Sequence, residues 1–561
     1  MANCVSRLAA RPAALGLLFA TTMLAPVARA RAPDWVSTAT LGVPVAALVG
    51  ATDQGPLSSS QALTVRVGMT PRNLAALQQL VVAQATPGNP DYEKFLTPSR
   101  FRAMFGPSTA QINRVVNYLQ TAGFTNITVE PNGLLISADG TAGMAALAFN
   151  TALEQVAIGS ATQFINTSAA QVPAKLGGVV SAVLGLNNVG MMLPPLALPS
   201  LPQYAVSYTP TQFQQIYSVS KVKPATRASI AIMAEGDLTG VFADLRTAEA
   251  AFGLPQVPVT LVQVGVASTD TSGADEWDLD TQYSSGMAQD LKMLYVYATT
   301  SLSDSDLALE FSHWATDDLA KAASASLGEC EGFAYLDGSM AIDDMSFLQA
   351  ASQGQTFFAS AGDTGSFCPI GPAGVNGVPV GAPLVNYPAA SPYVVGVGGT
   401  TLLTNADGSY DLETAWATGG GGVSQFEGSP YWQQAQVALL APADLRGVPD
   451  IAMDADPESG AEVYVNGAPE GVGGTSLSSP LALGVWARTI SINRKLGNAG
   501  PLIYSLYDGT GGTGGLTGTY PEGGFHDITL GTNGLYEAGP GYDLTTGLGT
   551  FIVDQFTKDL K

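Results

Sequence analysis

The sequence predicts an α/β protein in which a parallel β-sheet with helices on both faces follows a small α+β domain. From about residue 205 onward, short apolar runs alternate with amphipathic stretches, and this alternation is typical of strand–helix–strand units in a parallel sheet. Residues 60–160 combine alternating strands with helical spacing of Leu and Val. Their order, β-α-α-β-β-α-β, is close to the split βαβ, or ferredoxin-like, arrangement.

Composition narrows the class of protein. The 561-residue chain is 46% hydrophobic and 12% charged, which excludes a disordered chain and a coiled coil. Its net charge of −23 argues against a basic face that binds nucleic acid. Residues 1–204 carry a net charge of +4 and residues 205–561 one of −27, so we expect the two parts to attract each other. Protonation of the acidic part would leave few charges, which limits unfolding by self-repulsion in acid.

The N-terminus has the pattern of an export signal. Arg7 and Arg11 precede the apolar run 13–27, and residues 27–30 resemble a signal-peptidase site that would be cut after Ala30. The run is too short for a comfortable membrane span, and no other stretch reaches about 18 uninterrupted apolar residues. We expect a secreted protein, extracellular or periplasmic, that does not bind a membrane.

Two cysteines, Cys330 and Cys368, remain once the signal peptide with Cys4 is removed. In an oxidising compartment, a disulfide between them is favoured over two buried free thiols.

Local patterns predict the elements of the N-terminal part. The expected strands are 63–69, 127–130, 134–138 and 154–158, and the expected helices are 71–84, 107–122 and 142–149. Pro131-Asn132-Gly133 predicts a hairpin turn. Residues 170–203 are rich in Pro, Leu, Ala and Gly, which predicts a linker.

The C-terminal part is analysed in the same way. The expected strands are 228–234, 259–264, 323–327 and 356–360, and the expected helices are 242–252, 284–299, 346–353 and 481–490. In open parallel sheets, functional residues gather at the carboxyl ends of the strands.

Ser476 is the first candidate for chemistry, because it lies in the Gly-rich turn 473–480 before the last of these helices. A hydroxyl at a helix N-terminus is exposed, and the helix dipole favours negative charge that develops beside it. A serine nucleophile also needs a base. His313 and His526 are the only histidines, and neither lies in a motif that resembles a Ser-His-Asp triad.

A carboxylate pair in the stretch 275–282 offers a different base. Glu276 and Asp280 are four residues apart, so they would share one helix face. Two carboxyls this close share a proton and titrate as a pair, which suits acid–base catalysis in acid. Asp278 and Gln282 form a second possible pair, so the spacing alone leaves the register open.

Asp363 is the third candidate. The apolar strand 357–360 ends in Gly362-Asp363-Thr364-Gly365, which places this carboxyl at the edge of the sheet. A protonated aspartic acid there could donate a hydrogen bond to an oxyanion.

Together these motifs resemble the sedolisin family of serine-carboxyl peptidases. The residues that match, in order, are Glu276, Asp280, Asp363 and Ser476, with the flanking motifs 324–331, 386–393 and 448–452. The resemblance runs over about 205–561, and residues 60–160, with the motifs 92–97 and 105–108, look like the family's activation propeptide. The resemblance implies a subtilisin-like fold, activity in acid, one calcium ion and autocatalytic removal of the propeptide. It divides the chain into a signal peptide (1–30), a propeptide with linker (31–200) and a peptidase domain (201–561).

The resemblance also implies a role for each candidate. Ser476 would be the nucleophile, Glu276 the general base and later the general acid, Asp280 the group that holds Glu276, and Asp363 the acid of the oxyanion hole. Because Asp363 must be protonated to donate, rising pH would remove a donor. Residues 326–328 would pair with the substrate backbone as an edge strand.

Three further features follow from the resemblance. The glycine run 419–422 would form a second wall facing the substrate, and Glu235 would lie near the catalytic carboxyls. Spacing alone gives only a weak signal for a metal at the C-terminus, where carboxylates and turn carbonyls offer the hard oxygen ligands that Ca²⁺ prefers. The family places one calcium ion there, and the ligands would be Asp527, Asp543 and the carbonyls of Ile528, Gly539 and Gly541.

We therefore expect a secreted acid endopeptidase that is made as a zymogen, acts on proteins or peptides and is a monomer. Its basic propeptide would lie on the acidic domain as an inhibitor, and acid would weaken that contact. A calcium-stabilised binding protein on the same fold and an esterase with the same groups remain alternatives. The sequence sets neither the cleavage specificity nor the mature N-terminus, beyond a position near 190–206.

Overall fold

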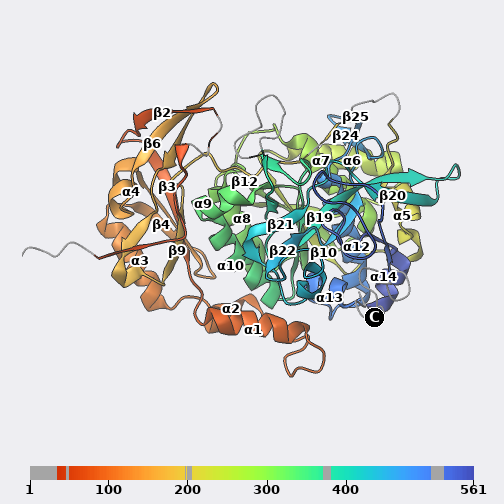
Figure 1. The fold of residues 1–561 in the computed structure, drawn as a ribbon, viewed down its shortest axis with the longest axis horizontal. Helices are drawn as coiled ribbons and strands as arrows, with labels where there is room; N and C mark the ends of the chain where they lie inside the picture. The colour runs from red at the N-terminus through yellow and green to blue at the C-terminus, as the bar shows by residue number, and fades with distance from the viewer. Residues whose placement is uncertain are drawn as a thin grey trace, which may run out of the picture. The chain divides into compact units, whose positions relative to one another are not determined.

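The computed structural model describes residues 34–560 except 46, 47, 49, 196, 199–204, 370–380 and 507–523. The expected signal peptide lies outside these residues. From Trp35 onward the chain forms one compact unit, which contains an antiparallel N-terminal sheet and a larger, mostly parallel sheet (Figure 1).

The N-terminal part is built on a four-stranded antiparallel sheet. The strand order is β4–β5–β3–β9, with β3 (Ala62–Met69), β4 (Thr125–Val129), β5 (Leu135–Thr141) and β9 (Val180–Leu184). Its helices are α1 (Leu74–Ala85), α2 (Pro98–Met104), α3 (Thr109–Thr121) and α4 (Ala142–Ala148). The hairpin predicted around Asn132 is confirmed, because β4 pairs with β5.

The strand expected at 154–158 is confirmed as β6 (Leu153–Ile158). Its place in the ferredoxin-like order is wrong, because it pairs with β2 (Ala51–Pro56) and β7 (Ala161–Asn166) in a separate sheet. The fourth strand of the main sheet is instead β9, which lies inside the expected linker 170–203. The average composition of that segment concealed a short apolar run, and the run forms a strand because its side chains are buried against β3.

The C-terminal part contains an eight-stranded sheet. Its order is β11–β12–β10–β13–β15–β19–β20, and β23 also pairs with β19. All pairs are parallel except β19 with β20. The strands are β10 (Ser229–Glu235), β11 (Val259–Gln263), β12 (Met293–Thr299), β13 (Ala322–Ala325), β15 (Thr356–Ser360), β19 (Val395–Thr404), β20 (Tyr410–Ala415) and β23 (Ile451–Asp454).

Helices cover both faces of this sheet, as the sequence predicts (Figure 1). One group packs together as α6 (Thr239–Phe252), α7 (Ala274–Ala288) and α12 (Thr475–Ile492). The other group is α8 (Asp304–Asp317) with α10 (Ser339–Ser352). The fold is therefore the predicted subtilisin-like parallel sheet preceded by an N-terminal α+β part.

The helix predicted at 284–299 is wrong. Helix α7 ends at Ala288, and residues 293–299 form the strand β12, which lies between β11 and β10 in the sheet. A strand that is buried on both faces has a continuous apolar run, and periodicity cannot distinguish such a run from a buried helix. The chain turns between the two elements at Gln289 and Asp290, which both have positive φ.

Shorter elements complete the described chain. The remaining strands are β1 (Trp35–Ser37), β8 (Gln171–Pro173), β14 (Glu329–Cys330), β16 (Cys368–Pro369), β17 (Gly381–Ala382), β18 (Asn386–Tyr387), β21 (Gly422–Gly428), β22 (Leu445–Val448), β24 (Ala461–Val465), β25 (Ala468–Val472), β26 (Phe525–His526) and β27 (Thr550–Phe551). The remaining α-helices are α5 (Pro210–Ile216), α9 (Glu331–Asp337), α11 (Gln434–Val437), α13 (Ala499–Ser505) and α14 (Val553–Asp559).

A disulfide joins Cys330 to Cys368, as favoured from the sequence. It links the start of α9 to the segment after β15. Among the described helices, none has the length and apolar character needed to span a membrane.

Two neighbouring acids, the buried Asp344 on α10 and the half-buried Glu427 on β21, both have raised pKa values. Burial is the main cause that raises the pKa of Asp344 to about 6, against hydrogen bonds that lower it. Burial also raises the pKa of Glu427 to about 10, and the neighbouring Asp344 raises it further. The two carboxyls hydrogen-bond each other, which requires that at least one of them holds a proton.

This pair predicts that the folded chain loses thermal stability as pH rises. A carboxyl group whose pKa is higher in the folded chain than in the unfolded chain stabilises the folded chain when it is protonated. This stabilisation is complete below the unfolded pKa, which is about 4 for Asp. That stability is lost as pH rises through the folded pKa, which is about 6 for Asp344. Glu427→Gln leaves Asp344 a hydrogen-bonding partner without a second acid, so it should flatten the fall in melting temperature.

Calorimetry of the chain with Ser476→Ala, between about pH 4 and pH 7, measures this effect. The matched control is Asp411→Asn, which removes an exposed carboxylate. An equal pH dependence in Glu427→Gln and the control would contradict the prediction.

Candidate active site

Helix α7 brings Glu276 and Asp280 to one face, and both side chains are buried, at 1% and 0% exposure. Burial raises the pKa of Glu276 well above its usual value, and the charge of Asp280 raises it further. Burial likewise raises the pKa of Asp280, although the Ser326 hydroxyl lowers it by donating to Asp280 Oδ1 at 2.6 Å. The two carboxyls therefore behave as one buried acid pair.

The structure also decides the register that the spacing left open. Asp278 faces Asp244 on α6, and burial raises its pKa to about 9. Gln282 donates to the Tyr464 carbonyl at 2.8 Å. The pair Asp278 and Gln282 therefore lies on a different side of α7 from the acid pair.

Ser476 lies in the first turn of α12, which begins at Thr475, earlier than the helix predicted at 481–490. Its side chain is fully buried, and its hydroxyl lowers the pKa of Glu276, so the two side chains face each other. Within the described residues, however, neither the Ser476 Oγ nor the two carboxyl oxygens of Glu276 form a hydrogen bond. Hydrogen bonds of this kind are often long until a substrate binds.

Asp363 lies three residues after Ser360, the residue at the carboxyl end of β15. Its Oδ1 accepts two hydrogen bonds from Thr475, from the backbone N–H at 2.8 Å and from the hydroxyl at 2.7 Å. Its Oδ2 is buried and accepts nothing within the described chain. Burial raises the pKa of Asp363 to about 7. Because Oδ1 is saturated with donors, the acid proton belongs on Oδ2.

A segment of the N-terminal part crosses this site. Leu193 and Gly328 exchange backbone hydrogen bonds of 2.9 and 3.1 Å, and Ala197 and Gly473 exchange bonds of 3.1 and 2.7 Å. Both contacts are antiparallel β-bridges. The edge expected at 326–328 therefore pairs, through Gly328, with the chain's own Leu193, which lies in a stretch that the sequence analysis assigned only to a linker.

Pro195 is the residue of this segment that lies next to Asp363. A Cβ built on Gly474 would overlap the Pro195 carbonyl oxygen and lie 2.6 Å from Asp363 Oδ2. The Pro195 carbonyl and the Asp363 carboxyl therefore meet over the backbone of Gly474. A cavity of about 260 Å³ beside them is lined by Met191, Leu193 and Phe333 among others.

Of two other predicted features, one adjoins the Asp363 turn and one lies away from Glu276. The glycine run 419–422 packs against the Asp363 turn, where the Gly420 N–H donates to the Gly362 carbonyl at 2.6 Å. Glu235, at the end of β10, faces Asp270 and Asp306, and burial raises its pKa to about 7. It is therefore grouped with these acids and not with Glu276.

Both histidines are outside the site. His313 forms an ion pair with Glu130 of the N-terminal part at 3.0 Å. His526 stacks on Tyr410, and burial lowers its pKa to about 4, so it is neutral above that pH. Sequence reasoning missed Thr475 as a partner of Asp363, although it adjoins the candidate serine.

The C-terminal calcium candidates come together in one loop. The Gly541 N–H donates to both oxygens of Asp527 at 3.1 Å, and the Gly539 N–H donates to Asp543 Oδ2 at 3.1 Å. Burial is the main cause that raises the pKa of Asp527 to about 6, and the charge of Asp543 raises it further. No ion pair among the described residues involves Asp527 or Asp543, and two neighbouring carboxylates of this kind fit a hard divalent ion.

The remaining ligands of such an ion would be backbone carbonyls. Within the described residues, no cluster of three or more His, Cys, Asp or Glu side chains could hold a metal. The carbonyls of Ile528, Gly539 and Gly541 would therefore have to complete the shell.

Comparison with known proteins identifies relatives over nearly the whole chain. Residues 49–189 match the family model "Pro-kumamolisin, activation domain", and residues 263–500 match the model "Subtilase family". Sedolisin from Pseudomonas sp. (strain 101) is 35% identical, over 94% of this chain and 92% of its own. Xanthomonalisin from Xanthomonas sp. (strain T-22) is 36% identical, over 89% of this chain and 65% of its own.

A solved structure agrees with these relatives. Pseudomonas sedolisin, a serine-carboxyl proteinase complexed with two molecules of pseudo-iodotyrostatin, superposes with a TM-score of 0.57 at 34% sequence identity. The match covers 63% of this chain and 98% of that chain.

Proposed function

The chain belongs to the sedolisin family of serine-carboxyl peptidases, and from this premise we propose that it is a secreted acid endopeptidase made as an inactive precursor. That it is a serine-type peptidase with an N-terminal activation domain follows from its relatives. Secretion, activity in acid and the role of each residue are our proposals. The observation that carries them is the meeting of Ser476, Glu276 and Asp363 under the chain's own segment 191–197.

In the proposed reaction, the Ser476 Oγ attacks the peptide carbonyl and Glu276 takes its proton. Asp280 holds Glu276, and Asp280 is itself held by the Ser326 hydroxyl. The Asp363 Oδ2–H and the Ser476 N–H donate to the oxyanion, and donors of this kind contribute most of the stabilisation in acyl transfer. Glu276 then gives its proton to the leaving amine, and water hydrolyses the acyl-enzyme.

These groups predict activity in a window on the acid side of neutrality. Asp363 donates only while protonated, so activity falls as pH rises through its pKa of about 7. Glu276 accepts a proton only after the acid pair has lost one, so activity also falls when the pair becomes fully protonated. The pKa of each member of this pair is raised by burial.

The segment 191–197 supports self-processing. It pairs with Gly328 and Gly473 as an added strand, which is how an extended peptide substrate binds a sheet edge. The carbonyl beside Asp363 belongs to Pro195, so we propose a first cut at or next to the bond that follows Pro195. Until that cut, the segment blocks the site.

The first prediction for this function concerns the precursor. On a shift from neutral pH to about pH 4, near the usual pKa of Glu, the wild-type chain should shorten to a fragment that begins close to residue 196 and gain peptidase activity. Ser476→Ala should do neither. Intact mass and peptide hydrolysis measure both, and a Ser476→Ala chain that shortens at the wild-type rate would contradict the assignment.

A second prediction isolates Asp363. In Asp363→Asn the two donors of Thr475 hold the amide oxygen at the Oδ1 position, so the amide N–H₂ takes the place of Oδ2 and donates at every pH. The fall in kcat through about pH 7 should therefore disappear in the processed enzyme. Asp363→Ala, which donates at no pH, should lose about 10²–10³ in kcat. An unchanged alkaline limb in Asp363→Asn would refute the proposed role.

We also propose one structural calcium ion held by Asp527, Asp543 and the carbonyls of Ile528, Gly539 and Gly541. Its charge would neutralise two facing carboxylates, and it takes no part in the reaction steps above. Chelation of the precursor with Ser476→Ala should lower the melting temperature by several degrees, and added Ca²⁺ should restore it. Asp527→Asn should remove that difference and the bound metal, and a chelation effect that survives in Asp527→Asn would contradict the site.

A further inference from the structure

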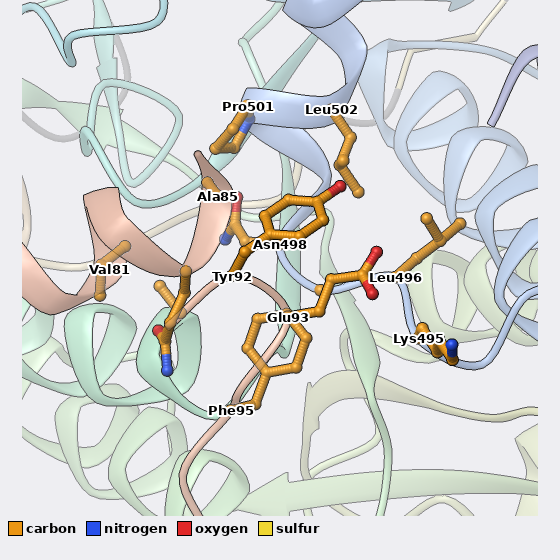
Figure 2. A pocket seen from close by; sticks show the side chains of 13 residues that line it. Val81, Ala85, Tyr92, Glu93, Phe95, Lys495, Leu496, Asn498, Pro501 and Leu502 are labelled. Carbon is orange, nitrogen blue, oxygen red and sulfur yellow. The ribbon is translucent and has the colours of Figure 1, made fainter. Parts of the chain in front are cut away.

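The N-terminal part contacts the peptidase part at several places besides the segment near Ser476, and one of them involves an aromatic side chain held between two glycines. Helix α1 packs against α10, and the loop that follows returns as the segment Tyr92–Leu96, here called the anchor segment (Figure 2). Several of its side chains line a pocket together with Leu496, Asn498 and Leu502 of the peptidase part.

Phe95 is the centre of this contact. Its ring lies between two glycines from separate segments, Gly354 after α10 and Gly497 before α13. A Cβ on Gly354 would lie 2.7 Å from the Phe95 Cγ, and a Cβ on Gly497 would overlap the tip of the ring. We call the space between these two glycines the glycine notch.

The backbone conformation favours glycine at only one of these two positions. Gly354 has a φ of +72°, a conformation that favours glycine in any case. Gly497 has no such φ, and the three atoms nearest to a Cβ there all belong to the Phe95 ring. The Phe95 ring is therefore the nearest obstacle to a side chain at position 497.

Hydrogen bonds add to this contact. The Ser352 carbonyl, at the end of α10, accepts from the Leu96 N–H at 2.9 Å and from Gln84 Nε2 at 3.0 Å. Gln84 is 2% exposed and also donates to the Lys94 carbonyl at 2.8 Å. The last carbonyls of a helix lack partners within it, and the N-terminal part supplies the partners of one of them, the Ser352 carbonyl.

The glycine notch and the catalytic groups lie at opposite ends of β15. Gly354 comes just before this strand, and Asp363 comes just after it. A cut near Pro195 would free the segment 191–197 from the site, but it would leave Phe95, Leu96 and Gln84 in place. Cutting and release would then be separate steps.

We propose that the glycine notch is a docking site for the anchor segment, which keeps the severed N-terminal part bound to the peptidase part after the linker is cut. This inference rests on the proposed cut, but the contact it concerns is independent of the catalytic groups. Its partner is chemically defined: an extended segment that presents one aromatic ring and backbone donors.

The experiment uses the full chain with Ser476→Ala, so that the chain's own activity plays no part. A recognition sequence for an added site-specific protease is inserted after Leu198, which is 66% exposed. After cutting, gel filtration over a dilution series gives the dissociation constant of the two parts. Gly497→Ala should weaken retention roughly tenfold or more, because overpacking a filled site is costly.

The control is Gly240→Ala, where a Cβ meets nothing within 4 Å, and it should retain the N-terminal part as the parent does. Phe95→Ala should also weaken retention. The double variant Phe95→Ala with Gly497→Ala should be no weaker than Phe95→Ala, since the clash is gone and the two effects are not additive.

Retention by Gly497→Ala equal to that of Gly240→Ala would overturn the proposal. If Gly497→Ala does not fold but the double variant does, the clash with Phe95 is the cause and the proposal stands. If both fail to fold, Gly497 serves the peptidase fold itself and the proposal is wrong. A wild-type chain that never processes in acid would refute the proposed function and leave this result unaffected.

Discussion

The close approach of α7 and α12 is the contact on which the candidate site depends. A Cβ on Gly484 of α12 would lie 2.5 Å from the Met287 Cβ of α7, so the helices meet with no side chain between them at that point. This approach holds Glu276 and Asp280 against the first turn of α12. It also removes them from water, and burial is the largest cause of their raised pKa. One packing contact therefore both positions the acid pair and keeps protons on it.

Acidic groups lie at the contact between the two parts of the chain. Two ion pairs join the parts, Glu130 with His313 and Asp306 with Arg66. A group of buried acids lies there as well: Asp304 and Asp337 are beside Gly190, Glu329 is next to Asp304, and burial raises the pKa of each of the three. Protonation of these acids favours the closed precursor. Acid therefore does not simply drive the two parts apart, which agrees with a severed part that stays bound.

Much of the fold followed from local patterns, and the failures have identifiable causes. Strands such as Ile230–Ala234 were predictable because apolar runs alternate with amphipathic helices. Residues 293–299 were not, because a strand buried on both faces has the same apolar run as a buried helix. The strand at 180–184 was hidden in a segment of linker composition, and only pairing with β3 makes it a strand. Local sequence records which residues avoid water, whereas pairing depends on partners distant in the chain.

The site shows the same division. The sequence by itself determined the candidates, Ser476, Glu276, Asp280 and Asp363, because their motifs, taken together and in this order, resemble those of the sedolisin family. Only the tertiary structure decided that Glu276 and not Asp278 faces the serine, and that Thr475 saturates Asp363 Oδ1. It also decided that the chain's own Leu193 occupies the edge at Gly328. These are contacts between groups far apart in sequence, and their geometry exists only once the helices and strands have packed.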